Sequence, residues 1–222
     1  MYSVLLSKIE FGFPLINNRL KEIVNENMKV VVIPWAFPTE LDYDRLVNEY
    51  FKEGEKKYNK YINSLLELGI QKENITILNC YEKDTSNFKN IINSADLLVL
   101  PGGNPINQIE IINKINLKNI INKAKVVIGV SAGAINLSEE AIYYNDYSEK
   151  IEMYDGIGLT DINVYPHFDI TNKDFVEEVK MVSRLKSLIA LPNNSFIKID
   201  DKQIEFIGDS FKVDKENIIK IN

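Results

Sequence analysis

Residues Val126–Ile135 read VVIGVSAGAI, an apolar run that passes into a Gly-x-Ser-x-Gly motif and then into residues that favour a helix. The first five letters have the composition of a buried strand, and the stretch after the motif, AINLSEE, that of a helix. A strand, a tight turn and a helix in this order form the unit of an α/β protein. The motif puts Ser131 in the turn, where it is either a nucleophile or a small residue that allows close packing.

The alternation of strand-like and helix-like stretches continues along the whole chain. It predicts an α/β fold in which a doubly wound, mostly parallel sheet is flanked by helices. The predicted strands are Tyr2–Leu6, Lys29–Pro34, Ile75–Asn79, Leu97–Leu100, Val126–Val130, Asn163–Tyr165, Ser187–Leu191, Ser195–Ile199 and Ile204–Ile207. The predicted helices are Leu15–Asn27, Leu41–Leu68, Ser86–Asn93, Ile106–Ile112, Ala132–Glu139 and Asp174–Lys186.

The last two predicted strands are separated by the short polar stretch Asp200-Asp201-Lys202 and are expected to form a C-terminal β-hairpin. Neither a Pro/Gly/Ser-rich linker nor a shift in composition divides the chain. Its 222 residues, 45% of them hydrophobic, have the size and composition of one large globular domain. We therefore predict a single domain over residues 1–222.

The charge and the cysteine content argue against several classes of partner and site. The net charge of −6 and the absence of a long basic run make nucleic acid and anionic membranes unexpected partners. The single cysteine, Cys80, rules out an internal disulfide, and no Cys/His cluster has the spacing of a structural metal site. We expect no metal and no cofactor, and the sequence does not separate a monomer from a homodimer.

The N-terminal letters MYSVLL lack a basic region ahead of their short apolar run, which predicts a first strand rather than a signal peptide. No segment approaches the roughly 18 consecutive apolar residues of a membrane span. Together with the lone cysteine, these observations predict a cytoplasmic protein.

The Gly-x-Ser-x-Gly turn suits acyl transfer when it joins a strand to a helix. The serine then has a strained backbone, and the flanking glycines leave room for it. The next backbone N–H, that of Ala132, opens the helix and faces the place where an oxyanion forms. The motif alone is weak evidence, but the strand before it and the helix after it favour the nucleophile.

A serine nucleophile needs a general base, and the chain contains one histidine. His167 stands in VYPHFD, directly after the predicted strand Asn163–Tyr165. A lone histidine is more often structural, but here it supplies the base that Ser131 requires. We therefore predict a Ser131–His167 pair.

The third motif is Leu100–Pro105, which reads LPGGNP and joins a strand to an amphipathic stretch. Two consecutive glycines, Gly102 and Gly103, let the backbone approach a ligand closely, so either N–H is a candidate second oxyanion donor. Asn104 is a candidate substrate contact. An ordinary strand-to-helix turn is the alternative, and a phosphate loop is excluded because no Gly-Lys-Ser/Thr follows.

These three motifs in this order resemble the peptidase E family, aspartyl dipeptidases related to cyanophycinase, and the resemblance extends over nearly the whole chain. It implies a fold similar to class I glutamine amidotransferases and a serine exopeptidase activity. By the same resemblance, Ser131 is the nucleophile, His167 the base, and Gly103 with Ala132 the oxyanion donors. A glutamine amidotransferase itself would need a cysteine in the turn, and Cys80 lies elsewhere.

The sequence departs from the family at the third member of the triad. Where peptidase E has a glutamate after a late Leu-Pro pair, Leu191-Pro192 is followed by Asn193. An asparagine can orient an imidazole, but it stabilises imidazolium less than a carboxylate does. Asp146, fifteen residues after the serine, resembles an aspartate of the family and is a second candidate to support His167 or to contact the substrate; it is equally compatible with an exposed loop.

The sequence leaves open whether the aspartyl specificity that the resemblance implies is kept, because a site for an acidic side chain needs an Arg or Lys. Between His167 and Leu191 the chain offers Lys173, Lys180, Arg184 and Lys186, mostly within a predicted helix. The leading hypothesis is a serine peptidase that hydrolyses a short peptide, dipeptide or isopeptide through a Ser131 acyl-enzyme. The alternative is a weak or inactive homologue that binds a small ligand or a partner.

Overall fold

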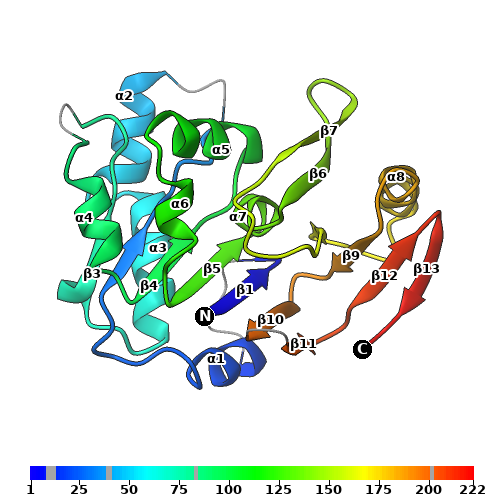
Figure 1. The fold of residues 1–222 in the computed structure, drawn as a ribbon, viewed down its shortest axis with the longest axis horizontal. Helices are drawn as coiled ribbons and strands as arrows, with labels where there is room; N and C mark the ends of the chain where they lie inside the picture. Colours follow the sequence, from blue (N-terminus) through cyan, green and yellow to red (C-terminus); the bar gives the residue numbers. More distant parts are fainter. Residues whose placement is uncertain (9–13, 39–41, 83–84, 201–202) are drawn as a thin grey trace.

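The central feature of the computed structural model is a seven-stranded sheet with the order β11-β10-β1-β5-β4-β2-β3 (Figure 1). The structure describes residues 1–8, 14–38, 42–82, 85–200 and 203–222. The run from β1 to β3 is parallel, and β10 and β11 continue the sheet antiparallel beside β1. These strands are β1 (Tyr2–Leu6), β2 (Val30–Val32), β3 (Ile75–Ile77), β4 (Leu97–Leu100), β5 (Val126–Val130), β10 (Phe196–Asp200) and β11 (Gln203–Ile207). The predicted α/β fold is confirmed.

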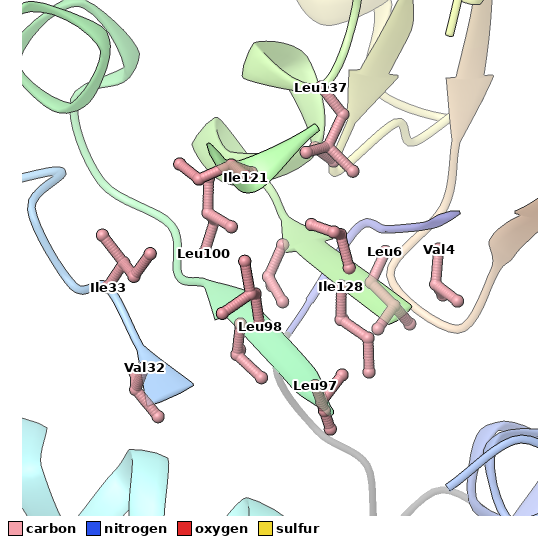
Figure 2. Close-up of a cluster of buried hydrophobic side chains, with 14 of the residues drawn as sticks. Val4, Leu6, Val32, Ile33, Leu97, Leu98, Leu100, Ile121, Ile128 and Leu137 are labelled. Carbon is pink, nitrogen blue, oxygen red and sulfur yellow. The ribbon is translucent and has the colours of Figure 1, made fainter. Parts of the chain in front are cut away.

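The main core lies around the middle of this sheet. Every residue of β4 and β5 is buried, as expected for parallel strands with both faces covered. Figure 2 shows this packing, with aliphatic side chains of β1, β4 and β5 gathered beside Ile121 and Leu137. This rigid centre holds the ends of β1, β4 and β5 in fixed positions.

Helices flank the sheet, and several are shorter than predicted (Figure 1). They are α1 (Pro14–Leu20), α2 (Tyr43–Leu46), α3 (Lys56–Glu67), α4 (Phe88–Asn93), α5 (Pro105–Lys114), α6 (Lys118–Ile121), α7 (Ala132–Asn136) and α8 (Lys173–Ser183), with a π-helical turn η1 (Val47–Phe51) and a 3-10 turn η2 (Lys72–Asn74). Among the described helices, none combines the length and the apolar character that a membrane crossing requires.

The prediction of one continuous helix over Leu41–Leu68 is wrong. Its first residue lies outside the described residues, and the remainder forms α2, η1 and α3. The chain leaves helical geometry at Lys52, whose ψ is 127°, and Gly54 has a φ of 93°. A residue with positive φ cannot continue a right-handed helix, so the apolar periodicity runs across a real break.

Two further β units adjoin the central sheet, and the sequence patterns missed most of their strands. The hairpin of β6 (Glu140–Asn145) and β7 (Lys150–Asp155) stands away from the sheet, near α8 (Figure 1). A four-stranded sheet has the order β13-β12-β9-β8 and includes β8 (Val164–Pro166), β9 (Leu188–Leu191), β12 (Phe211–Asp214) and β13 (Asn217–Lys220). The predicted hairpin is present as β10–β11, whose turn residues 201–202 lie outside the described residues, but β12 and β13 follow it.

Candidate active site

Ser131 lies in a strained turn between β5 and α7. Its φ and ψ are 52° and −112°, which an L-residue rarely adopts, and its N–H donates to Leu6 O at 2.8 Å. A Cβ on Gly129 would lie 2.6 Å from Gly133 O, and one on Gly133 would lie 1.9 Å from Leu100 O. Both flanking glycines are therefore required by close backbone packing, as a nucleophile elbow demands.

His167 is directly opposite this serine. It follows β8, and its Nε2 lies 2.8 Å from Ser131 Oγ. Its backbone is also left-handed, with a φ of 64°, and its N–H donates to Ser7 Oγ at 2.6 Å. Ser7 comes directly after β1, the neighbour of β5 in the sheet. The unusual backbone of His167 is thus tied to the same sheet edge that carries Ser131.

Asn193 is the group behind the imidazole. Its Oδ1 lies 2.7 Å from His167 Nδ1. The parallel register of β8 and β9 pairs Pro166 with Leu191, so the residues that follow both strands lie side by side. Because an amide oxygen only accepts, Nδ1 carries the hydrogen and Nε2 is left to accept from the Ser131 hydroxyl.

The Pro-Gly-Gly loop after β4 lies against the serine. A Cβ built on Gly102 would be 2.9 Å from Ser131 Cβ, and one on Gly103 would be 1.8 Å from Ala36 O, with a φ of 145° at Gly103. Neither the Gly103 N–H nor the Ala132 N–H has a hydrogen-bond partner among the described residues. Asn104 accepts from Asn107 N at 3.2 Å and so caps α5, while also lining the pocket beside Ser131.

Asp146 does not support His167. Asn193 occupies the position behind the ring, and Asp146 lies in the turn of the β6–β7 hairpin. From there it lines a pocket of about 380 Å³ that opens beside Ser131. Of the two roles considered for this aspartate, its position fits contact with a substrate.

Four tyrosines and one phenylalanine line this pocket, which we call the tyrosine pocket. Its lining comprises Pro38, Gly103, Asn104, Pro105, Ser131, Ala132, Ile135, Tyr143, Tyr144, Asn145, Asp146, Tyr147, Tyr165, Pro166, His167 and Phe175. The Tyr165 hydroxyl donates to Glu178 Oε1 behind the wall. Burial, together with the nearby charge of Asp146, raises the pKa of Glu178 above its usual range.

A second hollow of about 240 Å³ also borders Ser131. It shares Pro38, Gly103, Ser131 and His167 with the tyrosine pocket, but its ionisable groups, apart from the shared His167 and two tyrosines, are Lys8, Lys57 and Lys60. The described lining is therefore acidic and aromatic in the tyrosine pocket and basic in the second hollow.

The sequence patterns missed Ser7 and the aromatic wall. Ser7 carries a weak signal, since it directly follows a correctly predicted central strand, where site residues of parallel sheets lie. The tyrosines carry none, because the β6–β7 hairpin that presents Tyr143 and Tyr144 was not predicted. Among the described residues, no group of three His, Cys, Asp or Glu side chains is placed to hold a metal ion.

Comparison with known families adds a direct assignment. The family model described as Peptidase family S51 matches residues 7–207, which include the elbow, His167 and Asn193. The chain belongs to peptidase family S51. It is accordingly a serine-type peptidase of the peptidase E type, and the predicted resemblance is confirmed.

Solved structures with the same fold include other peptidases. A protein from Listeria monocytogenes EGD-e assigned to peptidase E is 19% identical, with a TM-score of 0.69 over 92% of this chain and 96% of that one. A peptidase from an acI-B1 actinobacterium is 16% identical, with a TM-score of 0.69 over 100% of this chain and 93% of that one. No curated protein sequence matches this S51 chain. At these identities the structural likeness concerns the fold.

Proposed function

We propose that this S51 peptidase hydrolyses a short peptide, a dipeptide or an isopeptide, through an acyl-enzyme on Ser131. The observation that carries the proposal is the unbroken chain of hydrogen bonds from Ser131 Oγ through His167 to Asn193, at 2.8 and 2.7 Å. A nucleophile, a base and a group that orients the base are the minimum for serine acyl transfer.

In the acylation step, Ser131 Oγ attacks the carbonyl carbon while its proton passes to His167 Nε2. The N–H groups of Gly103 and Ala132, which have no other partner in the described chain, stabilise the oxyanion. The scissile C–N bond then breaks as Nε2 returns the proton to the leaving amine. A water molecule completes the cycle. His167 Nε2 takes a proton from the water while the water oxygen attacks the ester carbon. The bond to Ser131 Oγ then breaks, and Nε2 returns the proton to Oγ.

Asn193 holds His167 in the tautomer that this step needs. Its neutral oxygen stabilises the transient imidazolium less than a carboxylate would. We therefore expect a working but slower triad than one with an acidic third member. The left-handed backbone of His167, held by Ser7, sets the angle at which the ring meets Ser131.

The dimensions of the site favour a short substrate. The two hollows that border Ser131 measure about 380 and 240 Å³, each enough for about one or two residues. A reducing, cytoplasmic setting fits the single free cysteine, because burial raises the pKa of Cys80 to about 12 and leaves it an unreactive thiol.

The test is turnover of a dipeptide library by the wild type and by Ser131→Ala and His167→Ala variants. Both substitutions should lower kcat by about a thousandfold or more, because members of a triad act as a unit. Asp155→Asn, an exposed position at the end of the β6–β7 hairpin away from its turn, is the matched control and should keep wild-type activity. Equal activity of Ser131→Ala and wild type contradicts the proposal.

A further inference from the structure

The tyrosine pocket has a chemical character that the catalytic groups do not explain. Ser131, His167 and Asp146 all line it. Among the residues that the structure describes, its lining contains four tyrosines and Phe175, no Lys or Arg, and one carboxylate. Such a combination of aromatic faces with a carboxylate attracts a positive charge.

The negative charge of the pocket has no counter-ion in the described chain. Neither Asp146 nor Glu178 forms an ion pair with a described residue. Glu178 accepts from the hydroxyl of Tyr165, a residue that is only 5% exposed and lines the pocket. Glu178 is partly buried and Asp146 is exposed, and the charge of Asp146 contributes to the raised pKa of Glu178, so a cation bound near both carboxylates would be stabilised by both.

We propose that the tyrosine pocket is the subsite for a cationic group of the peptide substrate, an alkylammonium or a guanidinium. Asp146 pairs with the cation, the tyrosine rings surround its apolar stem, and Glu178, held through Tyr165, adds a second negative charge behind the wall. This inference rests on the proposed function, because it assigns the occupant of a pocket that opens at Ser131.

The second hollow supports this assignment by its different charge. Its described lining includes Lys8, Lys57 and Lys60 and no carboxylate, so a negatively charged group of the same substrate is favoured there over the tyrosine pocket. A carboxylate placed in the tyrosine pocket would meet Asp146 with no Lys or Arg in the described lining to compensate. An acidic side chain is therefore the least favourable occupant.

Two parts of a peptide can supply the cation: the α-ammonium at its N-terminus and the side chain of a basic residue. Both present a positive charge to Asp146. They differ in length, since the methylene stem of a basic side chain also packs against the aromatic rings.

The test measures binding to the Ser131→Ala protein by calorimetry, so that it does not depend on turnover. Four dipeptides vary the side-chain charge and the α-ammonium charge independently: Lys-Ala, norleucyl-Ala, and the Nα-acetylated form of each. Removing the relevant positive charge should weaken binding at least about tenfold. A loss on acetylation identifies the α-ammonium, and a loss on replacing Lys by norleucine identifies the side chain.

The Asp146→Asn substitution in the same protein should abolish that difference, while Asp155→Asn on the far end of the hairpin should preserve it. Circular dichroism confirms that both variants are folded. Equal binding of all four dipeptides, a difference that survives Asp146→Asn, or tighter binding of Nα-acetyl-Asp-Ala overturns the inference. Turnover by the wild type tests the proposed function separately, so the two can fail independently.

Discussion

At the scale of single residues, the site depends on Asn193, the uncharged group behind His167. Its oxygen lies 2.7 Å from Nδ1, close enough that an aspartate there could make the same contact with a full negative charge. We predict that Asn193→Asp raises kcat about tenfold, because a charged hydrogen bond exceeds a neutral one by roughly 1 kcal/mol or more.

The companion variant Asn193→Ala removes the orienting oxygen and should lower kcat below the wild-type value. Steady-state hydrolysis of one dipeptide by the three proteins measures this series. An Asn193→Asp protein that is folded but no faster than Asn193→Ala would show that this side chain does not act on the imidazole.

Ser7 acts on the histidine from its backbone. Its hydroxyl accepts from His167 N at 2.6 Å and holds a backbone with a φ of 64°. Loss of one hydrogen bond, worth about 1 kcal/mol, should lower kcat about fivefold in Ser7→Ala with little change in KM. Ser3→Ala, at a buried serine within the preceding strand β1, is the matched control, and a similar loss of kcat in both variants would contradict a positioning role.

The sequence predicted the reactive residues more fully than their supports. Ser131 and His167 were predictable because the elbow has a distinct pattern and the chain has a single histidine. Asn193 and Asp146 remained alternatives, since the choice depends on the register of β8 and β9, which no local pattern encodes. The position of Ser7 after a predicted strand gave only a weak signal, because its role depends on a contact with a residue 160 positions along the chain.

At the scale of elements, the loop after β4 is held by close backbone contact. A Cβ on Gly103 would lie 1.8 Å from Ala36 O, and the φ of 145° is unfavourable for any L-residue. We predict that Gly103→Ala displaces the loop, lowers the melting temperature and removes most activity together with one oxyanion donor.

Gly69→Ala is the matched control for this loop. Gly69 also has a positive φ, 92°, but nothing lies within 4 Å of its added Cβ, so the cost is the backbone strain alone, roughly 1–2 kcal/mol. It should lower the melting temperature and leave kcat unchanged. A Gly103→Ala protein that is as active as Gly69→Ala would contradict the assignment of the loop to the oxyanion site.

Elements buried in the central sheet were predicted well, and those outside it poorly. The strands β1, β4 and β5 match their predicted bounds because continuous apolar runs are an unambiguous signal. The β6–β7 hairpin is half exposed and rich in tyrosine and charge, so its pattern does not stand out. The break between η1 and α3 could not be predicted from the sequence pattern, because the helical spacing of apolar residues continues across it.

At the scale of the whole molecule, two sheets bring five strand ends to one place. Ser7, Gly102 and Ser131 follow β1, β4 and β5, while His167 and Asn193 follow β8 and β9 of the smaller sheet. The two sheets together therefore build the site, and the hairpin adds the acidic wall of the tyrosine pocket. This division explains why the catalytic centre was predictable from sequence and the substrate pocket was not.

The central claim is that Ser131 is a nucleophile activated by His167. Labelling by a fluorophosphonate probe, read by mass spectrometry of the intact protein and of its peptides, tests it most directly. We predict one adduct per wild-type chain, located on Ser131, no adduct on Ser131→Ala, and labelling of His167→Ala slowed by about a hundredfold or more. Undiminished labelling of Ser131→Ala, or a folded wild-type protein that does not react, would contradict the account.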